Sequence, residues 1–185
     1  GVEAVRRGPL GLDPVVRGLR ETEVGTYLDG ARMFPAGPAR MDSPLTHLDP
    51  SAIRSIQVVK GPYALTWGAG NLSAIRVETQ PLPRQEAGPA GSVAAGYDSN
   101  LQASETTGKV FGKNGRVSYF VMGAWRQGDD YESGADDAGN RTLIPGDFES
   151  WEGRGKFGFD LGDNSTLVVG GGYQEQGPID YPGRL

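Results

Sequence analysis

The chain has 185 residues and a formal net charge of −5 with a pI near 4.9, which argues against a nucleic-acid-binding protein with its basic surface. Cysteine is absent and His47 is the one histidine, so the sequence provides no disulfide, thiolate metal site or multi-histidine centre. The 30 glycines are more than twice the average share of roughly 7% and favour bends, close approaches and β-structure over helix bundles.

Residues 1–80 are predicted to form a domain of short strands and single helical turns. Strand-like runs lie beside breakers at three places: 24–28, 53–59 and 74–79. The stretch 33–50 is rich in proline, glycine and alanine and predicts a long loop. One helical turn is expected at 49–51, where Asp or Ser can cap and Pro suits the first helical position. A second is expected at 62–67, ended by Gly68.

Residues 81–90 have the composition of a linker, and the pattern after it has period two. The clearest strand is 151–161, which places aromatic and aliphatic residues on one face and charged residues on the other. Residues 167–173 and 117–125 repeat the alternation, although Phe120 and Met122 blur it. Weaker strands are expected at 93–97 and 101–111. The alternating pattern therefore predicts about five antiparallel strands in residues 91–185.

The predicted connections alternate in length. Tight turns are expected at 112–115 and 162–165, whereas 128–150 reads as a long acidic loop. Short turns on one side and long loops on the other are typical of an outer-membrane β-barrel, as are aromatic residues near the strand ends on the long-loop side. The aromatic residues in question are Tyr97, Trp125, Tyr131, Trp151 and Tyr173. A soluble antiparallel sandwich with its apolar face inward is the alternative.

An ordered series of motifs runs through residues 15–79. It consists of the pair Arg17-Gly18, the turn Asp29-Gly30, a strand ending in Lys60-Gly61-Pro62, the run Trp67-Gly68-Ala69-Gly70, and a last strand at 74–79. In order and spacing this series resembles the plug domain of TonB-dependent outer-membrane receptors. The family more often has Arg where Lys60 stands, Tyr where Trp67 stands and Asn where Arg76 stands, which suggests a divergent branch.

The resemblance implies a fold: a plug domain of mixed α+β type over 1–80, the linker 81–90, and, over 91–185, the first strands of a transmembrane barrel that has about 22 strands in this family. About five strands make an incomplete barrel, so we expect the chain to be a piece of a longer protein whose TonB box precedes Gly1. The structural motif residues are then Gly18, Asp29, Gly30, Gly61, Pro62, Trp67, Gly68 and Gly70.

The resemblance also implies active transport rather than catalysis. A scarce nutrient, often a metal chelate or siderophore, is taken up across the bacterial outer membrane, and no cofactor is expected. The implied partners are TonB with ExbB and ExbD, outer-membrane lipid and an external small ligand, with no nucleic acid. A non-transporting binding protein with a plug-like domain is the alternative, and an enzyme using His47 as a base is a third hypothesis.

Two groups of side chains are candidate sites. Arg17 and Lys60 match basic positions that in the family pair with glutamates of the barrel wall, where an unpaired charge is costly; we expect them to latch plug to barrel. A second candidate is a metal site, formed by Met33, Met41, Asp42 and His47. Thioether and imidazole ligands suit copper, and imidazole with carboxylate suits zinc. Packed methionines and a solvated histidine are the alternative.

Overall fold

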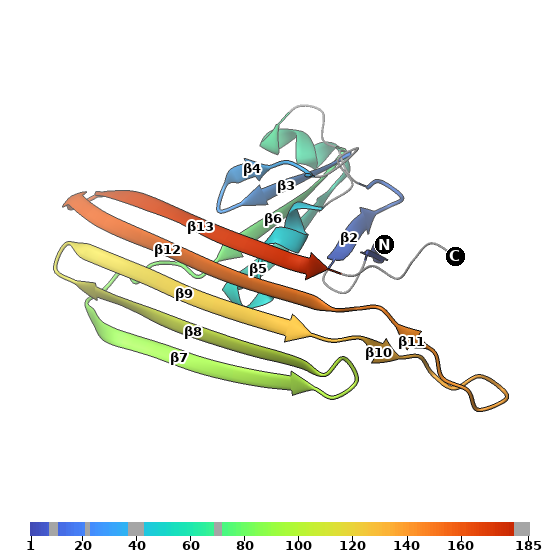
Figure 1. Ribbon diagram of the computed structural model, residues 1–185. Helices are drawn as coiled ribbons and strands as arrows, with labels where there is room; N and C mark the ends of the chain where they lie inside the picture. Colours follow the sequence, from blue (N-terminus) through green and yellow to red (C-terminus); the bar gives the residue numbers. More distant parts are fainter. Residues whose placement is uncertain (8–10, 21–22, 37–42, 69–71, 180–185) are drawn as a thin grey trace. The chain divides into compact units, whose positions relative to one another are not determined.

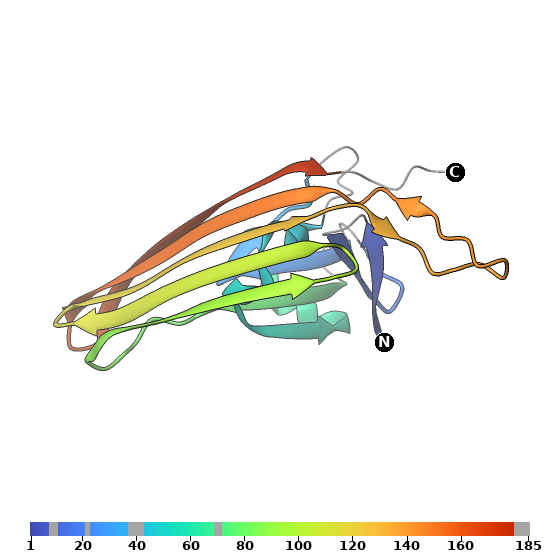
Figure 2. The ribbon, with the colours of Figure 1, turned by 60° about the horizontal axis from the view of Figure 1, so that its bottom comes forward.

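The computed structural model describes residues 1–7, 11–20, 23–36, 43–68 and 72–179. The chain divides into two compact units, Gly1–Pro81 and Leu82–Leu185. Each unit is described by itself below, and both are drawn in Figures 1 and 2. No helix among the described residues is long and apolar enough to cross a membrane.

The first unit contains a hairpin and a four-stranded sheet. The hairpin pairs β1 (Val2–Arg7) with β2 (Gly11–Val16). The sheet has the order β4-β3-β6-β5, in which β3 and β6 are parallel and the other pairs antiparallel. Its strands are β3 (Val24–Leu28), β4 (Ala31–Met33), β5 (Ile53–Lys60) and β6 (Ser73–Thr79). The three strands predicted for this domain are confirmed as β3, β5 and β6. For β3 the predicted first and last residues are also those observed.

The 3₁₀ turns η3 to η5 begin or end at residues whose chemistry suits the end of a helical turn. In η4 (Pro50–Ala52) the Asp49 carboxylate accepts from the Ser51 amide at 2.8 Å, and Pro50 fills the first position. The turn η5 (Gly61–Trp67) ends at Gly68, as predicted. The third, η3 (Pro44–His47), lies inside the stretch predicted as a loop, and Ser43 caps it.

The core of this unit forms where η5 covers the sheet. Tyr27 of β3, Ala64 of η5 and Ala74 of β6 are buried together, with Val59 packed against them. The small alanines let η5 approach the sheet closely, and the Tyr27 hydroxyl donates a hydrogen bond to the carbonyl of Trp67. The hydrogen bond from Tyr27 of β3 therefore fixes the backbone position of Trp67 relative to the sheet.

The second unit is one five-stranded antiparallel sheet with the order β13-β12-β9-β8-β7 (Figure 1). Its strands are β7 (Ala87–Asp98), β8 (Ala103–Asn114), β9 (Val117–Gly128), β12 (Phe148–Gly162) and β13 (Ser165–Ile179). Each strand pairs with its predecessor in this series, which is the meander expected from the alternating pattern. Because β7 begins at Ala87, residues 87–90 of the expected linker belong to the strand.

The connections alternate in length as predicted, but one turn and the end of the long loop lie at other residues than expected. The turn between β12 and β13 is Asp163-Asn164, inside the predicted 162–165. The turn between β8 and β9 is centred on Gly115-Arg116, later than predicted, because β8 runs on to Asn114. The predicted long loop contains a small hairpin, β10 (Tyr131–Glu132) with β11 (Leu143–Ile144), and ends at Phe148, where β12 starts.

Candidate functional site

The pair Arg17-Gly18 is the centre of a tight turn. Val16 and Leu19 exchange backbone hydrogen bonds of 2.9 and 3.0 Å across it. Both central residues have positive φ, +54° for Arg17 and +82° for Gly18, as in a type I′ turn. A positive φ is uncommon for arginine. The turn displays an exposed guanidinium at its tip.

The Asp29-Gly30 turn is tied to the end of β6. Both residues have positive φ, and the Asp29 carboxylate accepts from the Thr79 amide at 2.9 Å and from the Thr79 hydroxyl at 2.6 Å. The Asp29 amide in turn donates to the Val77 carbonyl at 2.9 Å. An aspartate is therefore needed here both for the turn and for its two acceptor oxygens.

The segment after β5 forms a stacked aromatic site. Gly61 has φ +68° and Pro62 follows it at the start of η5, while Gly68, at φ +138°, ends the turn. The Trp67 ring lies 3.8 Å under the Arg76 guanidinium. Arg76 also donates to Gln57 at 2.7 Å. The predicted motif residue Gly70 lies outside the described residues.

The two predicted latch cations lie at ends of strands in the first unit. Arg17 follows β2 at the tip of its turn, and Lys60, partly buried, is the last residue of β5. Their pairing with glutamates of a barrel wall stays a prediction.

The predicted metal ligands divide between described and undescribed residues. Met33 ends β4 and is half-buried, and His47 ends η3. The Nε2 atom of His47 is buried and has no hydrogen-bond partner among the described residues. Met41 and Asp42 lie outside the described residues. Within the described ranges no group of three or more His, Cys, Asp or Glu residues could hold a metal, so the mixed thioether and imidazole site stays a prediction.

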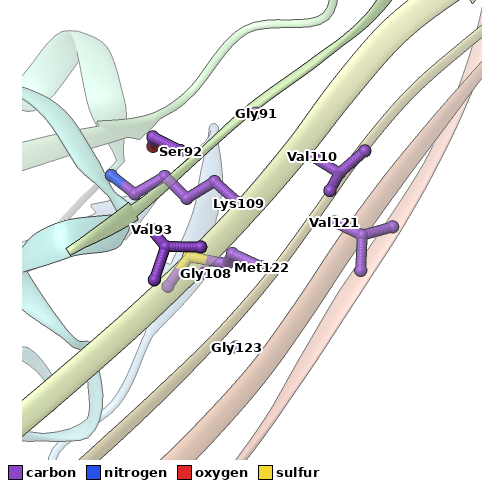
Figure 3. Close-up of a pocket in the computed structure, with 9 residues that line it drawn as sticks. All are labelled: Gly91, Ser92, Val93, Gly108, Lys109, Val110, Val121, Met122 and Gly123. Atoms are coloured by element: carbon purple, nitrogen blue, oxygen red, sulfur yellow. The ribbon is translucent and has the colours of Figure 1, made fainter. Parts of the chain in front are cut away.

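One face of the five-stranded sheet, here called the inner face, carries ion pairs. Glu152, whose side chain is 1% exposed, accepts from Arg154 at 2.7 Å along β12. Arg126 of β9 lies 3.4 Å from Glu105 of β8. Phe120 and Met122 are also buried on this face. They blur the alternation of β9 because they are apolar residues at inner-face positions. Figure 3 shows Lys109 and Met122 on the opposite side of the sheet from Val110 and Val121.

The opposite, outer face is apolar and exposed. Along β12 it presents Trp151, Phe157, Phe159 and Leu161, each at least 40% exposed. Trp151 packs against Tyr173 of β13 in a tilted arrangement with ring centroids 5.1 Å apart, near the end of the sheet with the long connection. Charge buried on one face and apolar side chains exposed on the other is the reverse of a soluble sheet and the pattern of a lipid-facing barrel wall.

The long connection has ordered polar structure beyond the small hairpin. Asp136 Oδ1 accepts from the amides of Ala138 and Asn140 at 2.9 and 2.8 Å, and its Oδ2 accepts from the Asn140 side chain. The hydrogen bonds from Asn140 lower the pKa of Asp136. Asp136 therefore stabilises the turn at 136–140 by local hydrogen bonds.

Several contacts had only a partial signal in the sequence. The period of 151–161 places Glu152 and Arg154 on one face, but their pairing depends on rotamers that no pattern encodes. The stacking of Trp67 on Arg76, nine residues apart, depends on how η5 folds over β6. Both residues stood out in the sequence as departures from the family pattern.

Comparisons with known proteins agree with this architecture. The family model TonB-dependent Receptor Plug Domain matches residues 1–75, and a comparison with curated proteins found no match. Among solved structures, the copper transporter OprC is 28% identical with a TM-score of 0.82, covering 100% of this chain and 27% of its own. The FrpB iron transporter from Neisseria meningitidis (F3-3 variant) is 18% identical with a TM-score of 0.75, covering 95% and 27%.

A third solved structure extends the agreement. The pyoverdine outer membrane receptor FpvA from Pseudomonas aeruginosa PAO1, bound to pyoverdine, is 21% identical with a TM-score of 0.71, covering 95% of this chain and 24% of its own. The chain thus spans about a quarter of the length of these solved structures. Residues 1–75 therefore match the TonB-dependent receptor plug domain, and the sheet that follows shares its fold with antiparallel strands of such receptors.

Proposed function

We propose that this chain is part of a TonB-dependent transporter that imports a scarce nutrient across the bacterial outer membrane. The observation that carries the proposal is the reversed burial of β12, with Glu152 and Arg154 inward and Phe157 and Leu161 exposed. A sheet of this kind is stable with its outer face in lipid, and the plug domain before it belongs to receptors of this class. Transport, not catalysis, is the proposed activity.

The proposed substrate class is a metal ion or a metal chelate. The names of the similar structures, a copper transporter, an iron transporter and a pyoverdine receptor, support this class. In the plug, the Nε2 of His47 is buried and has no partner within the part of the chain that the structure describes, which supports direct coordination, since an imidazole in such a place gains from a ligand. Met33, Met41 and Asp42 are the proposed companion ligands, and thioether with imidazole favours copper.

The proposed partners follow from the same family. TonB, with ExbB and ExbD, would act on the plug from the periplasmic side, while the outer face of the sheet contacts outer-membrane lipid. Arg17 and Lys60 are proposed to latch the plug to glutamates of the barrel wall. An exposed guanidinium on a rigid type I′ turn is well suited to a contact that forms and breaks repeatedly.

Uptake by the full-length receptor tests transport. Cells lacking the gene are complemented with it, in strains with and without TonB, and accumulation of labelled copper, zinc and ferric siderophore is measured. We expect uptake of one of these substrates only where both receptor and TonB are present. Binding at the cell surface with no TonB-dependent accumulation would support a non-transporting binding protein instead.

The metal site is tested by a double variant in the same cells. Met41→Ala with His47→Ala should weaken binding of the metal by tenfold or more, while Met122→Leu, a methionine of the sheet, should leave it unchanged. Equal metal affinity in the double variant and the wild type would exclude these ligands. TonB-dependent uptake of a chelate with unaltered affinity would then leave the transport proposal standing without them.

A further inference from the structure

The segment that leads into β7 is bound to the wall of the second unit at two points. Residues 82–86, here called the connector, precede β7 in that unit. The Arg84 carbonyl accepts a hydrogen bond of 3.2 Å from Lys113 Nζ, near the end of β8. The Leu82 Cδ1 atom lies 2.9 Å from the place that a Cβ on Gly158 would occupy. The connector thus touches both β8 and β12.

Lys113 is itself held by a fixed carboxylate. Its Nζ lies 2.5 Å from Asp160 Oδ2 on β12, and its side chain is 12% exposed. The other oxygen, Asp160 Oδ1, accepts from the Thr166 hydroxyl of β13 at 2.8 Å. An ammonium has three donors, so Lys113 can bond the carboxylate and the connector carbonyl together. Charge-assisted bonds of this kind are the strong ones.

The second point depends on the lack of a side chain at residue 158. A Cβ at Gly158 would meet Ser118 Oγ at 2.5 Å and Leu82 Cδ1 at 2.9 Å, both closer than real Cβ contacts. Leu82 is half-buried there. Both contacts lie toward the end of the sheet with the tight turns at 115–116 and 163–164.

We propose that Lys113 clamps the connector to the barrel wall, so that the plug is tethered at residues 82–84 rather than at the start of β7. This inference rests on the proposed function, because a tether matters only where the plug is pulled. Residues before the clamp are free to move under load, while the connector stays on the wall. Without the clamp, movement would extend to Ala87, where pairing with Lys113 begins.

Trypsin reports directly on this clamp, because the bond it cleaves after Arg84 contains the carbonyl that Lys113 holds. The full-length receptor is digested in detergent micelles, and cleavage at Arg84 is followed by mass spectrometry. Cleavage at Arg141, exposed in the long connection, is the internal reference. Lys113→Met should raise the rate at Arg84 about tenfold, since a charge-assisted bond is lost, with no change at Arg141.

Matched variants separate the clamp from general loosening. Lys109→Met removes a lysine from the same face of β8 and should leave both rates unchanged, and Lys113→Arg should retain most of the protection. If Lys113→Met does not assemble, Asp160→Asn, which keeps an acceptor, should give a smaller increase at Arg84. The clamp would be overturned if Lys113→Met were cleaved at Arg84 at the wild-type rate. The same result in Asp160→Asn would overturn it where Lys113→Met does not assemble. An equal increase of the rate in Lys109→Met would also overturn it. The digest needs neither TonB nor substrate, so it can fail while the uptake experiment succeeds.

Discussion

At the scale of single residues, Trp67 and Arg76 are contact partners. The resemblance marked both as departures from the residue expected at their motif positions, and the structure places the Arg76 guanidinium 3.8 Å from the centroid of the Trp67 ring. The Tyr27 ring also lies near the tryptophan, with the two ring centroids 6.3 Å apart. Changing one of the pair alone would leave the other without its contact, so the two are expected to be coupled.

A double-mutant cycle measures this coupling. Trp67→Ala, Arg76→Ala and the double variant are compared by hydrogen exchange of the β6 amides in the full-length protein. We expect an interaction free energy of about 0.5–1 kcal/mol, as for a cation–π contact that is only partly buried. Arg54→Ala, on exposed β5, should show no coupling with Trp67→Ala. Additive effects of the first pair would mean that the stacking contributes nothing to stability.

At this scale the sequence predicted the local turns and caps of the plug but not its long-range contacts. The sequence predicted the turn at Asp29-Gly30 and the cap at Asp49, since both follow from the chemistry of a few adjacent residues. It did not predict that Asp29 bonds Thr79, fifty positions later, because that contact depends on β3 and β6 lying side by side. The positive φ of Arg17 was also missed, since arginine gives no local signal for it.

At the scale of strands, the glycines explain how a narrow sheet carries long side chains. An ideal Cβ at Gly172 would lie 2.9–3.2 Å from the Arg154 guanidinium, at Gly96 2.7 Å from the Glu105 carboxylate, and at Gly112 2.6 Å from a hydroxyl. Each glycine therefore gives room for a side chain from the adjacent strand. The composition predicted close approaches, but only the pairing register shows which side chains make them.

The two faces of β12 should respond differently to added polarity. Phe157→Arg places a charge on the outer face and should destabilise the barrel by about 2–4 kcal/mol if the site is near the bilayer middle. Lys156→Gln, at the adjacent position on the inner face, should assemble normally. The measurement is the fraction of full-length receptor that migrates as a heat-modifiable folded barrel. Equal assembly of both variants would contradict a lipid-facing outer surface.

The strand boundaries show where periodicity is sufficient and where it is not. Alternation identified β12 and β13 because one face is consistently apolar. It was weak for β7, where glycine and alanine carry little contrast, and it ended β8 three residues early because Gly112 resembles a turn residue. The short pair β10–β11 was missed, since two-residue strands leave no periodic signal.

At the scale of the whole molecule, the chain combines a unit with its own small core and a sheet with exposed edges. The outer strands β7 and β13 each have one neighbour, and the apolar outer face runs across all five strands. Open edges and exposed apolar surface both promote association in water. The 185-residue chain alone should therefore not behave as a soluble monomer.

Size-exclusion chromatography tests this expectation. The isolated 185-residue chain should elute as aggregates without detergent, and detergent should disperse it because micelles cover the outer face. A monodisperse monomer in plain buffer would contradict the membrane interpretation of the sheet and favour a soluble β protein. Residues 1–81 alone, which lack the sheet, are the control and should not need detergent.

The parallel pairing of β3 with β6 has a mechanical consequence. The chain enters β3 at Val24 and leaves β6 at Thr79, and these two ends lie at opposite ends of the pair. A force applied before Val24 and resisted after Thr79 therefore loads the five residue pairs in shear, all at once, rather than opening them one by one. The centre of this sheet should yield late, after the β1–β2 hairpin has already been peeled away.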